Sequence, residues 1–118
     1  MPLSTEELEA RVQLLRDSYA TKLPAKLEQM ASNIAALTQA WDEECALDTG
    51  RLAHNLAGTG ETFGFVDIGG AARELETHLL AIQDGELPRT ELNQTKKLLD
   101  ELVAVARQCG VSITPAKT

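Results

Sequence analysis

The chain has 118 residues, and 43% of them are hydrophobic, which is enough for one domain with a single core. The formal net charge is −7, which disfavours binding to nucleic acids and to anionic membranes, because both attract clustered Lys and Arg side chains. The sequence has no run of about 18 apolar residues, so we expect no transmembrane helix. Its acidic beginning lacks the apolar segment of a secretory signal, so we expect a cytoplasmic protein.

The N-terminal third carries one apolar stripe with helical spacing. Ser4, followed three residues later by Glu7, forms a capping box that predicts a helix start. Pro24 interrupts the stripe, because proline lacks the amide donor and clashes one turn back. We expect two helical segments, Thr5 to Ala20 and Leu23 to Trp41, or one long helix bent at Pro24. The stripe consists of Leu8, Val12, Leu15, Tyr19, Leu23, Leu27, Met30, Ile34, Leu37 and Trp41.

A second helix follows the acidic segment 42–47 (DEECAL), which we expect to be a connection. Asp48 or Thr49 is expected to cap this helix, and Gly64 is expected to end it. Its predicted inward residues are Leu52, Leu56, Thr59 and Phe63.

Two further helices complete the chain. Asp67 is expected to cap the first and Gly85 to stop it, whereas Thr90 caps the last helix and Gly110 ends it. The first has the stripe Ile68, Ala72, Leu75, Leu79 and Ile82, and the last has Leu92, Thr95, Leu99, Leu102, Ala106 and Cys109.

These patterns predict an all-α protein, because no segment alternates polar and apolar residues with period two. Short connections between four helices from Leu23 onward indicate an antiparallel four-helix bundle with an additional N-terminal helix. Residues 1–118 are expected to form one domain, with a loose tail at about 112–118. Cys45 and Cys109 lack CxxC spacing and are expected to be small buried residues rather than a disulfide or metal pair.

The segment HNLAGTGETFGF, residues 54–65, has the most unusual composition. On a helix, His54 lies off the apolar stripe and is expected to be exposed. Gly58, at i+4, clears space beside the imidazole, and Gly60 allows another helix to pack closely. Both glycines weaken the helix by about 1 kcal/mol each relative to alanine, so each needs such a reason. The residues predicted to face away from the stripe are His54, Asn55, Ala57, Gly58, Glu61 and Thr62.

The longer run LAHNLAGTGETFGF resembles the signature of histidine-containing phosphotransfer (HPt) domains. That signature is a histidine, a leucine two positions later, a glycine at i+4, two small residues, and an aromatic or aliphatic residue before a glycine. The matching residues here are His54, Leu56, Gly58, Thr59, Gly60, Phe63 and Gly64. The helix beginning AARELETHLL at Ala71 is also similar to the next helix of the family.

The resemblance implies a phosphorelay protein of a two-component system. His54 would take a phosphoryl group from an aspartyl phosphate on a receiver domain and pass it to another receiver aspartate. The partners would be receiver domains of response regulators and hybrid histidine kinases, and the receiver would hold the Mg²⁺. The sequence has neither a GxxxxGK[ST] loop nor a kinase-type glycine-rich box, so we expect a monomeric carrier without a cofactor, a metal site or enzymatic activity.

Many family members have a lysine three residues after the histidine, whereas this chain has Ala57. Arg51, at i−3 from His54, either supplies the missing positive charge or is an ordinary solvated residue. By the resemblance, the residues that support His54 or contact the receiver are Arg51, Asn55, Ala57, Gly58, Glu61 and Thr62.

Other interpretations stay open at this point. The bundle could be a protein-binding module that docks receivers or other proteins without using phosphate. It could also be a phosphoacceptor domain cut from a larger hybrid or chemotaxis-type kinase. His78 is expected to be a half-buried or surface residue rather than a second acceptor, and a metal site shared by His54 and His78 is not expected.

Overall fold

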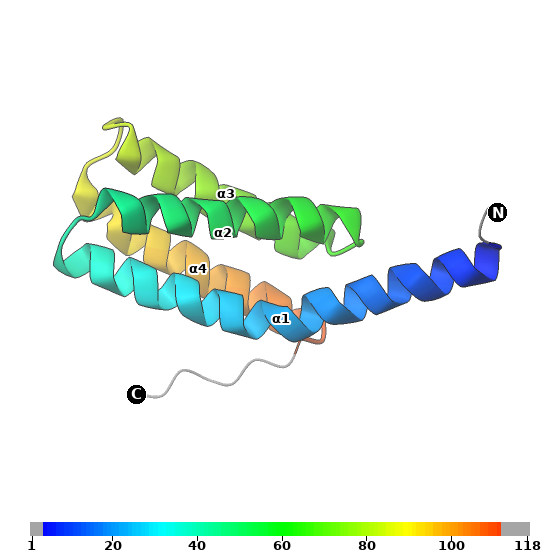
Figure 1. The fold of residues 1–118 in the computed structure, drawn as a ribbon. Coiled ribbons are helices and arrows are strands. Elements are labelled where there is room, and N and C mark those ends of the chain that lie inside the picture. Colours follow the sequence, from blue (N-terminus) through cyan, green and yellow to red (C-terminus); the bar gives the residue numbers. More distant parts are fainter. Residues whose placement is uncertain (1–3, 112–118) are drawn as a thin grey trace.

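The computed structural model describes residues 4–111, which form a bundle of helices (Figure 1). The elements are α1 (Thr5–Gln39), α2 (Glu43–Thr62), α3 (Val66–Gln83), the 3-10 helix η1 (Arg89–Glu91) and α4 (Leu92–Gln108). Residues 4–111 contain no β-strand, so the predicted all-α bundle is confirmed. The tail predicted for residues 112–118 lies outside the described residues. None of the described helices is long and apolar enough to cross a membrane.

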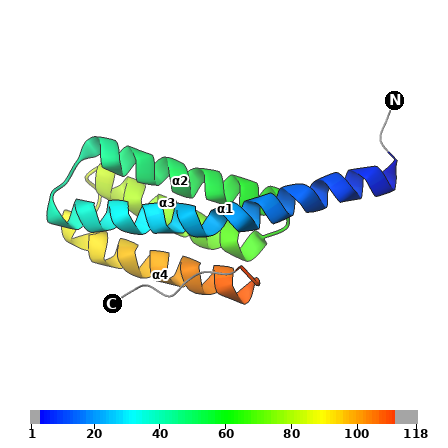
Figure 2. The ribbon, with the colours of Figure 1, turned by 60° about the horizontal axis from the view of Figure 1, so that its bottom comes forward.

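Pro24 does not divide the first helix, because α1 runs without a break for 35 residues. The predicted separate N-terminal helix is therefore wrong, and the alternative of one long helix is confirmed. Leu23 and Leu27 are buried beside Pro24, and their packing offsets the hydrogen bond that proline cannot donate. Figures 1 and 2 show α1 bending as it leaves the bundle, so its N-terminal part projects beyond the other helices.

The core follows the predicted stripes of α1 from Tyr19 onward, of α3 and of α4. On α2, only Leu56 of the four predicted inward residues is buried, and Leu52, Thr59 and Phe63 are half-buried. In α1 the stripe is buried from Tyr19 to Leu37, whereas Leu8, Val12 and Leu15 are exposed because they lie on the projecting part. All five stripe residues of α3 are buried, and so are all those of α4 except the last. Two hydrophobic clusters form this core and together involve all four α-helices.

The start of α2 lies earlier than predicted. Segment 42–47, expected to be a connection, supplies the N-cap and the first turn of the helix. The carboxylate of Asp42, rather than Asp48 or Thr49, caps the helix by accepting a hydrogen bond from the Cys45 amide at 3.2 Å. Thr49 is fully buried within the helix, and its hydroxyl donates to the Cys45 carbonyl at 2.8 Å. The Asp42 cap and the burial of Ala46 and Thr49 therefore favour the earlier helix start over the later capping signal.

The other two predicted helix caps are also wrong. Phe65 is the N-cap of α3, and Asp67 lies in the first turn of that helix. Thr90 belongs to η1, which precedes α4. The predicted helix ends are confirmed by glycines with positive φ, a conformation that is strained for other residues. Gly64, Gly85 and Gly110 have φ values of 84°, 78° and 88°.

The two cysteines differ in their surroundings. Cys45 is half-buried and its thiol donates to the Asn33 carbonyl at 3.6 Å. Burial, reinforced by Asp42 and Asp48, raises the pKa of the Cys45 thiol. The predicted burial of Cys109 is wrong, because this residue follows the last turn of α4 and is exposed. Both thiols are free.

Two glycines bring α2 and α3 into close contact. A Cβ on Gly60 would lie 2.9 Å from the Tyr19 hydroxyl oxygen and 3.3 Å from the amide nitrogen of Gly69. A Cβ on Gly69 would lie 3.0 Å from the carbonyl oxygen of Ala57. The prediction that Gly60 allows close helix packing is therefore confirmed, and Gly69 is its counterpart on α3.

Tyr19 fixes the end of this helix pair against α1. Its hydroxyl donates to the carbonyl oxygen of Leu56 at 3.0 Å, and its ring stacks on Phe65 with centroids 5.2 Å apart. Burial, with a smaller contribution from Cys109, raises the pKa of Tyr19 to about 12. The phenol therefore stays protonated and remains a hydrogen-bond donor throughout the ordinary pH range.

Replacing Gly69 with alanine tests the close contact. The added methyl group would press against the Ala57 carbonyl, so we expect Gly69→Ala to lower the free energy of unfolding by about 1–3 kcal/mol. Gly70→Ala is a matched control, because a Cβ there meets no atom within 4 Å. It should raise the free energy of unfolding by up to about 1 kcal/mol. Urea unfolding followed by circular dichroism measures both changes, and equal effects would contradict the close packing.

Candidate functional site

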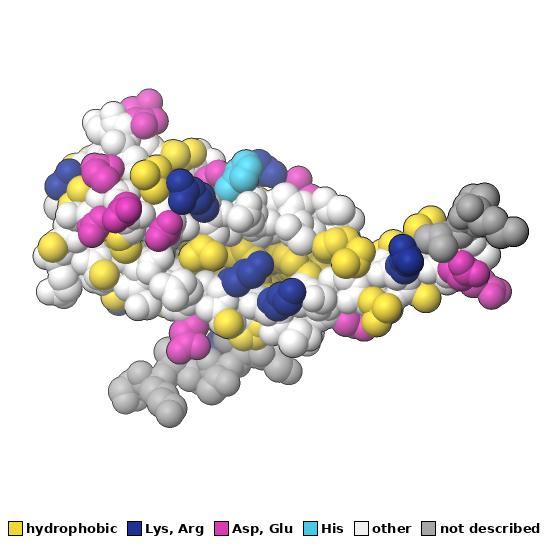
Figure 3. Space-filling model, in the orientation of Figure 1, with side chains coloured by type: hydrophobic (Ala, Val, Ile, Leu, Met, Phe, Trp, Pro, Cys, Tyr) yellow, Lys and Arg dark blue, Asp and Glu magenta, His cyan; other side chains and the backbone are white. Residues whose placement is uncertain are grey.

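His54 lies in the middle of α2 with its side chain 68% exposed, as predicted. Its neighbours Ala53 and Leu56 are buried in the core, so the helix that carries the imidazole is fixed on its inner side. The histidine is therefore an accessible group on a rigid support. Figure 3 shows a histidine side chain at the surface of the bundle, with basic and acidic side chains beside it.

Glu76 on α3 holds one nitrogen of this imidazole. The Nδ1 atom of His54 lies 2.8 Å from Oε2 of Glu76, whose side chain is only 15% exposed. A carboxylate accepts hydrogen bonds, so the contact places the proton on Nδ1. In the neutral imidazole, Nε2 then carries the lone pair and is the nucleophilic atom. Sequence reasoning missed Glu76, and its only signal was an acidic residue directly beside the buried Leu75.

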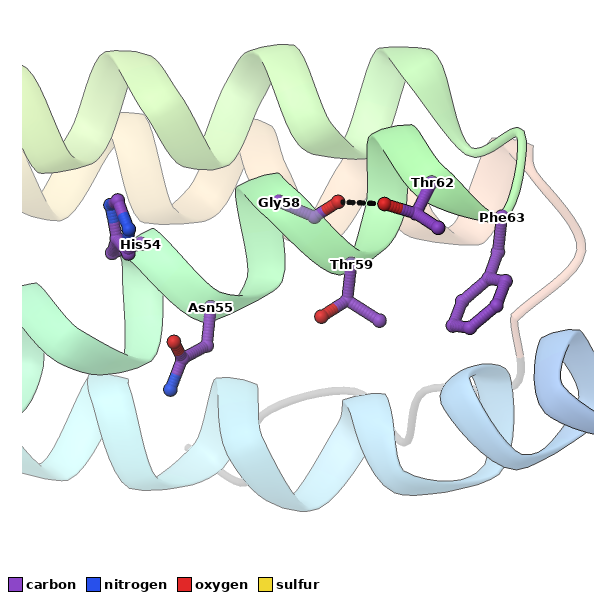
Figure 4. A pocket seen from close by; sticks show the side chains of 6 residues that line it. All are labelled: His54, Asn55, Gly58, Thr59, Thr62 and Phe63. Atoms are coloured by element: carbon purple, nitrogen blue, oxygen red, sulfur yellow. Dashed lines mark hydrogen bonds between the residues drawn. The ribbon is translucent and has the colours of Figure 1, made fainter.

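The space beside His54 is a shallow hollow of about 370 Å³ (Figure 4). A Cβ on Gly58 would meet no atom within 4 Å, so this glycine leaves the approach to the histidine open. The hydroxyl of Thr62 donates to the Gly58 carbonyl at 2.9 Å and is thereby turned toward its own helix. The hollow is lined by His54, Asn55, Gly58, Thr59, Thr62 and Phe63.

The predicted outward position of Ala57 is wrong, because this residue is fully buried. Gly60 and Gly69 bring α3 so close that the buried face of α2 widens to include Ala57. A docking protein cannot reach its side chain. Ala57 thus serves the packing of α2 on α3 and supplies neither contact nor charge to the histidine.

The charged residues that we expected around His54 are engaged in ion pairs. Arg51 faces Asp48, with Nη1 and Oδ1 3.5 Å apart, and both side chains are strongly exposed. Glu61 accepts two hydrogen bonds from Arg73 on α3, from Nη2 at 2.8 Å and from Nε at 3.1 Å. These bonds raise the pKa of Arg73, which stays charged. Like Glu76, Arg73 was not identified from the sequence.

His78 has a different environment from His54. Its side chain is 16% exposed, its Nδ1 lies 2.8 Å from the Thr95 hydroxyl, and its Nε2 lies 3.6 Å from Glu91. The expectation of a half-buried packing residue is confirmed. Among residues 4–111, no group of three or more His, Cys, Asp or Glu side chains is arranged to hold a metal ion.

Comparison with known proteins shows that the Hpt domain family matches residues 15–108. The match covers most of the chain, and the protein therefore belongs to this family of histidine-containing domains that transfer phosphoryl groups in two-component phosphorelays. No curated protein and no solved structure matches the chain. The part of α1 that precedes Leu15 lies outside the matched region.

The contact with Glu76 makes a prediction about the His54 tautomer. In the unsubstituted protein, the neutral form of the imidazole should carry its proton mainly on Nδ1. Glu76→Ala should shift the proton toward Nε2, and Glu74→Ala, an exposed position on the same helix, should leave the tautomer unchanged. Imidazole ¹⁵N chemical shifts report the tautomer directly. The same tautomer ratio in all three proteins would contradict the role of Glu76.

Proposed function

We propose that this protein is a phosphoryl carrier that relays a phosphoryl group between receiver-domain aspartates through a phosphohistidine at His54. The proposal rests on the different environments of the two ring nitrogens of His54. Nδ1 is held by Glu76, whereas Nε2 belongs to an exposed ring beside the open space at Gly58. Membership of the Hpt domain family supports the same function.

The transfer step follows from this geometry. The lone pair on Nε2 attacks the phosphorus atom of an aspartyl phosphate, the N–P bond forms, and the P–O bond to the aspartate breaks. The aspartate leaves as a carboxylate with its electron pair. The proton stays on Nδ1, so the phosphorylated ring carries a positive charge, which the Glu76 carboxylate stabilises at 2.8 Å. Transfer to the next receiver aspartate is the reverse reaction.

The receiver domain completes the site in this proposal. It supplies the aspartate and the Mg²⁺ that neutralises charge on the phosphoryl group during in-line transfer. Gly58, Asn55 and Thr62 lie in or beside the hollow that the receiver would enter. The chain contributes no nucleotide-binding motif, so it acts as a carrier and not as a kinase. A cytoplasmic location follows from these partners.

Replacing the histidine tests the proposal. His54→Gln should abolish uptake of ³²P from phosphorylated receiver domains, and the fold should persist because the side chain is exposed. His78→Gln is the matched control, because both nitrogens of that half-buried ring face polar partners within the bundle. It should retain at least about half of the uptake. Acid-labile label on the His54→Gln protein equal to that on the parent would refute the relay, as would a parent that binds receivers without taking label.

A further inference from the structure

Arg73 occupies a place on α3 that is level with the space next to His54. The helices α2 and α3 are antiparallel, and His54 on α2 contacts Glu76 on α3. The position three residues after His54 therefore lies level with the position three residues before Glu76. This relation places Arg73 opposite Ala57, about 4.5 Å along the helix axis from His54. Its guanidinium then reaches Glu61, one further turn along α2.

A phosphoryl group on His54 would need a cation at this place. It carries close to two negative charges, by analogy with other phosphorylated side chains. The carboxylates of Glu76 and Glu61 lie on the same side of α2, where α3 packs. Ala57 provides no charge, and Arg51 is paired with Asp48. Arg73 is 50% exposed, and its ion-pair partner among residues 4–111 is Glu61, which shares this side of α2.

We infer that Arg73 is the cation that binds the phosphoryl group on His54, and that it exchanges its ion pair with Glu61 for that group when His54 is phosphorylated. This inference rests on the proposed phosphoryl transfer. The planar guanidinium can donate two parallel hydrogen bonds to phosphoryl oxygens, which a lysine ammonium cannot do in the same geometry. Arg73 thereby takes the place of the lysine that many family members carry at the position of Ala57.

The experiment must separate this role from a structural role of the ion pair. Arg73→Ala and Glu61→Gln both break the pair, so a structural role predicts the same effect from both changes. Phosphoryl binding predicts opposite effects, because the first removes the cation and the second releases it and removes a negative charge. Arg51→Ala is the control for an exposed arginine near His54.

Each protein is phosphorylated both by a phosphorylated receiver and by phosphoramidate, a small donor that needs no docking. At low salt, Arg73→Ala should reduce the uptake rate or the phosphohistidine lifetime, measured by ³¹P NMR, about two- to fivefold. Glu61→Gln should increase the same quantity. With phosphoramidate, which needs no docking, Arg51→Ala should leave it unchanged. The effects of Arg73→Ala and Glu61→Gln should both be smaller at high salt, because salt screens the exposed charge of Arg73.

The outcomes are distinct. Equal effects of Arg73→Ala and Glu61→Gln, or an effect of Arg51→Ala larger than that of Arg73→Ala, would overturn the role of Arg73. Label on His54 of the parent would still support the relay in that case. A parent that takes label from neither donor would overturn both proposals. Circular dichroism melting curves show whether any variant has lost its fold.

The projecting part of α1 carries an independent feature. Leu8, Val12 and Leu15 are 53%, 40% and 51% exposed and continue the stripe that is buried from Tyr19 onward. Figure 3 shows hydrophobic side chains along this projection. A single helix of this length is marginal on its own in water, so an apolar face here favours packing against another helix.

The charges beside this stripe fit a second copy of the same chain. The spacing of four, three and four residues places Leu8 and Leu15 at one type of heptad core position and Val12 at the other. In an antiparallel pair with Val12 opposite Leu15 of the second copy, Glu9 faces Arg16 of that copy, and the symmetry repeats the contact. Arg16 is half-buried with its guanidinium 5.2 Å from the centre of the Phe65 ring, and it has no carboxylate partner among residues 4–111, so its charge can still pair with Glu9 of a second copy.

We propose that the projecting parts of two chains pair in this antiparallel way to form a dimer, in place of the monomer expected from the sequence. Sedimentation velocity of the 118-residue protein should show a concentration-dependent dimer. The double change Leu8→Glu and Leu15→Glu should give a monomer, whereas Leu80→Glu, at an exposed leucine on α3, should not.

Charge exchange tests the orientation of the pair. Glu9→Arg should weaken the dimer by placing arginine opposite arginine, and adding Arg16→Glu to it should restore the dimer. A parent that stays monomeric at every concentration would overturn the proposal. A dimer that is unchanged by the double leucine substitution, or not restored by the charge exchange, would overturn it as well.

Discussion

The close contact of α2 with α3 is the constraint on which the site depends. Gly60 and Gly69 leave no room for a Cβ between the two helices, and Ala57 lies in the same contact. This spacing is what allows a carboxylate on α3 to reach His54 at 2.8 Å while the imidazole stays exposed. A wider separation would put the Glu76 carboxylate beyond hydrogen-bonding distance of the ring. The two nitrogens of His54 would then no longer have different environments.

The two partners of the hydrogen bond between His54 and Glu76 differ in how far they are buried. Glu76 is largely covered, so few other groups compete for its carboxylate, and the imidazole it holds stays fixed in orientation. His54 keeps an exposed ring, which in the proposed transfer would let it reach a phosphoryl group carried by another protein. His78 shows the contrast within the same bundle, since its ring is covered and both of its nitrogens face polar partners.

The sequence was sufficient for those parts of the structure that depend on strong local signals. The stripe of α3 from Ile68 to Ile82 and the glycines that end α2, α3 and α4 were predicted correctly, because large apolar residues at helical spacing and positive φ leave clear patterns. Ala57 was misplaced because alanine has a weak preference for burial, and its position depends on how close α3 approaches. Glu76 and Arg73 were missed because their contacts with α2 depend on the relative height and rotation of two helices.

The charge of the whole chain and the charge around the site point in different directions. A net charge of −7 would repel an acidic receiver pocket at long range. On the face that Figure 3 shows, however, a band of hydrophobic side chains has basic groups on either side of it, and both basic and acidic side chains lie beside the histidine. Phe63 lines the hollow beside His54, and Leu52 and Arg51 line a second hollow that shares Asn55 with the first. In the proposed complex, apolar contact and short-range positive charge would therefore provide the binding energy, and the remaining acidic surface would weaken encounters in any other orientation.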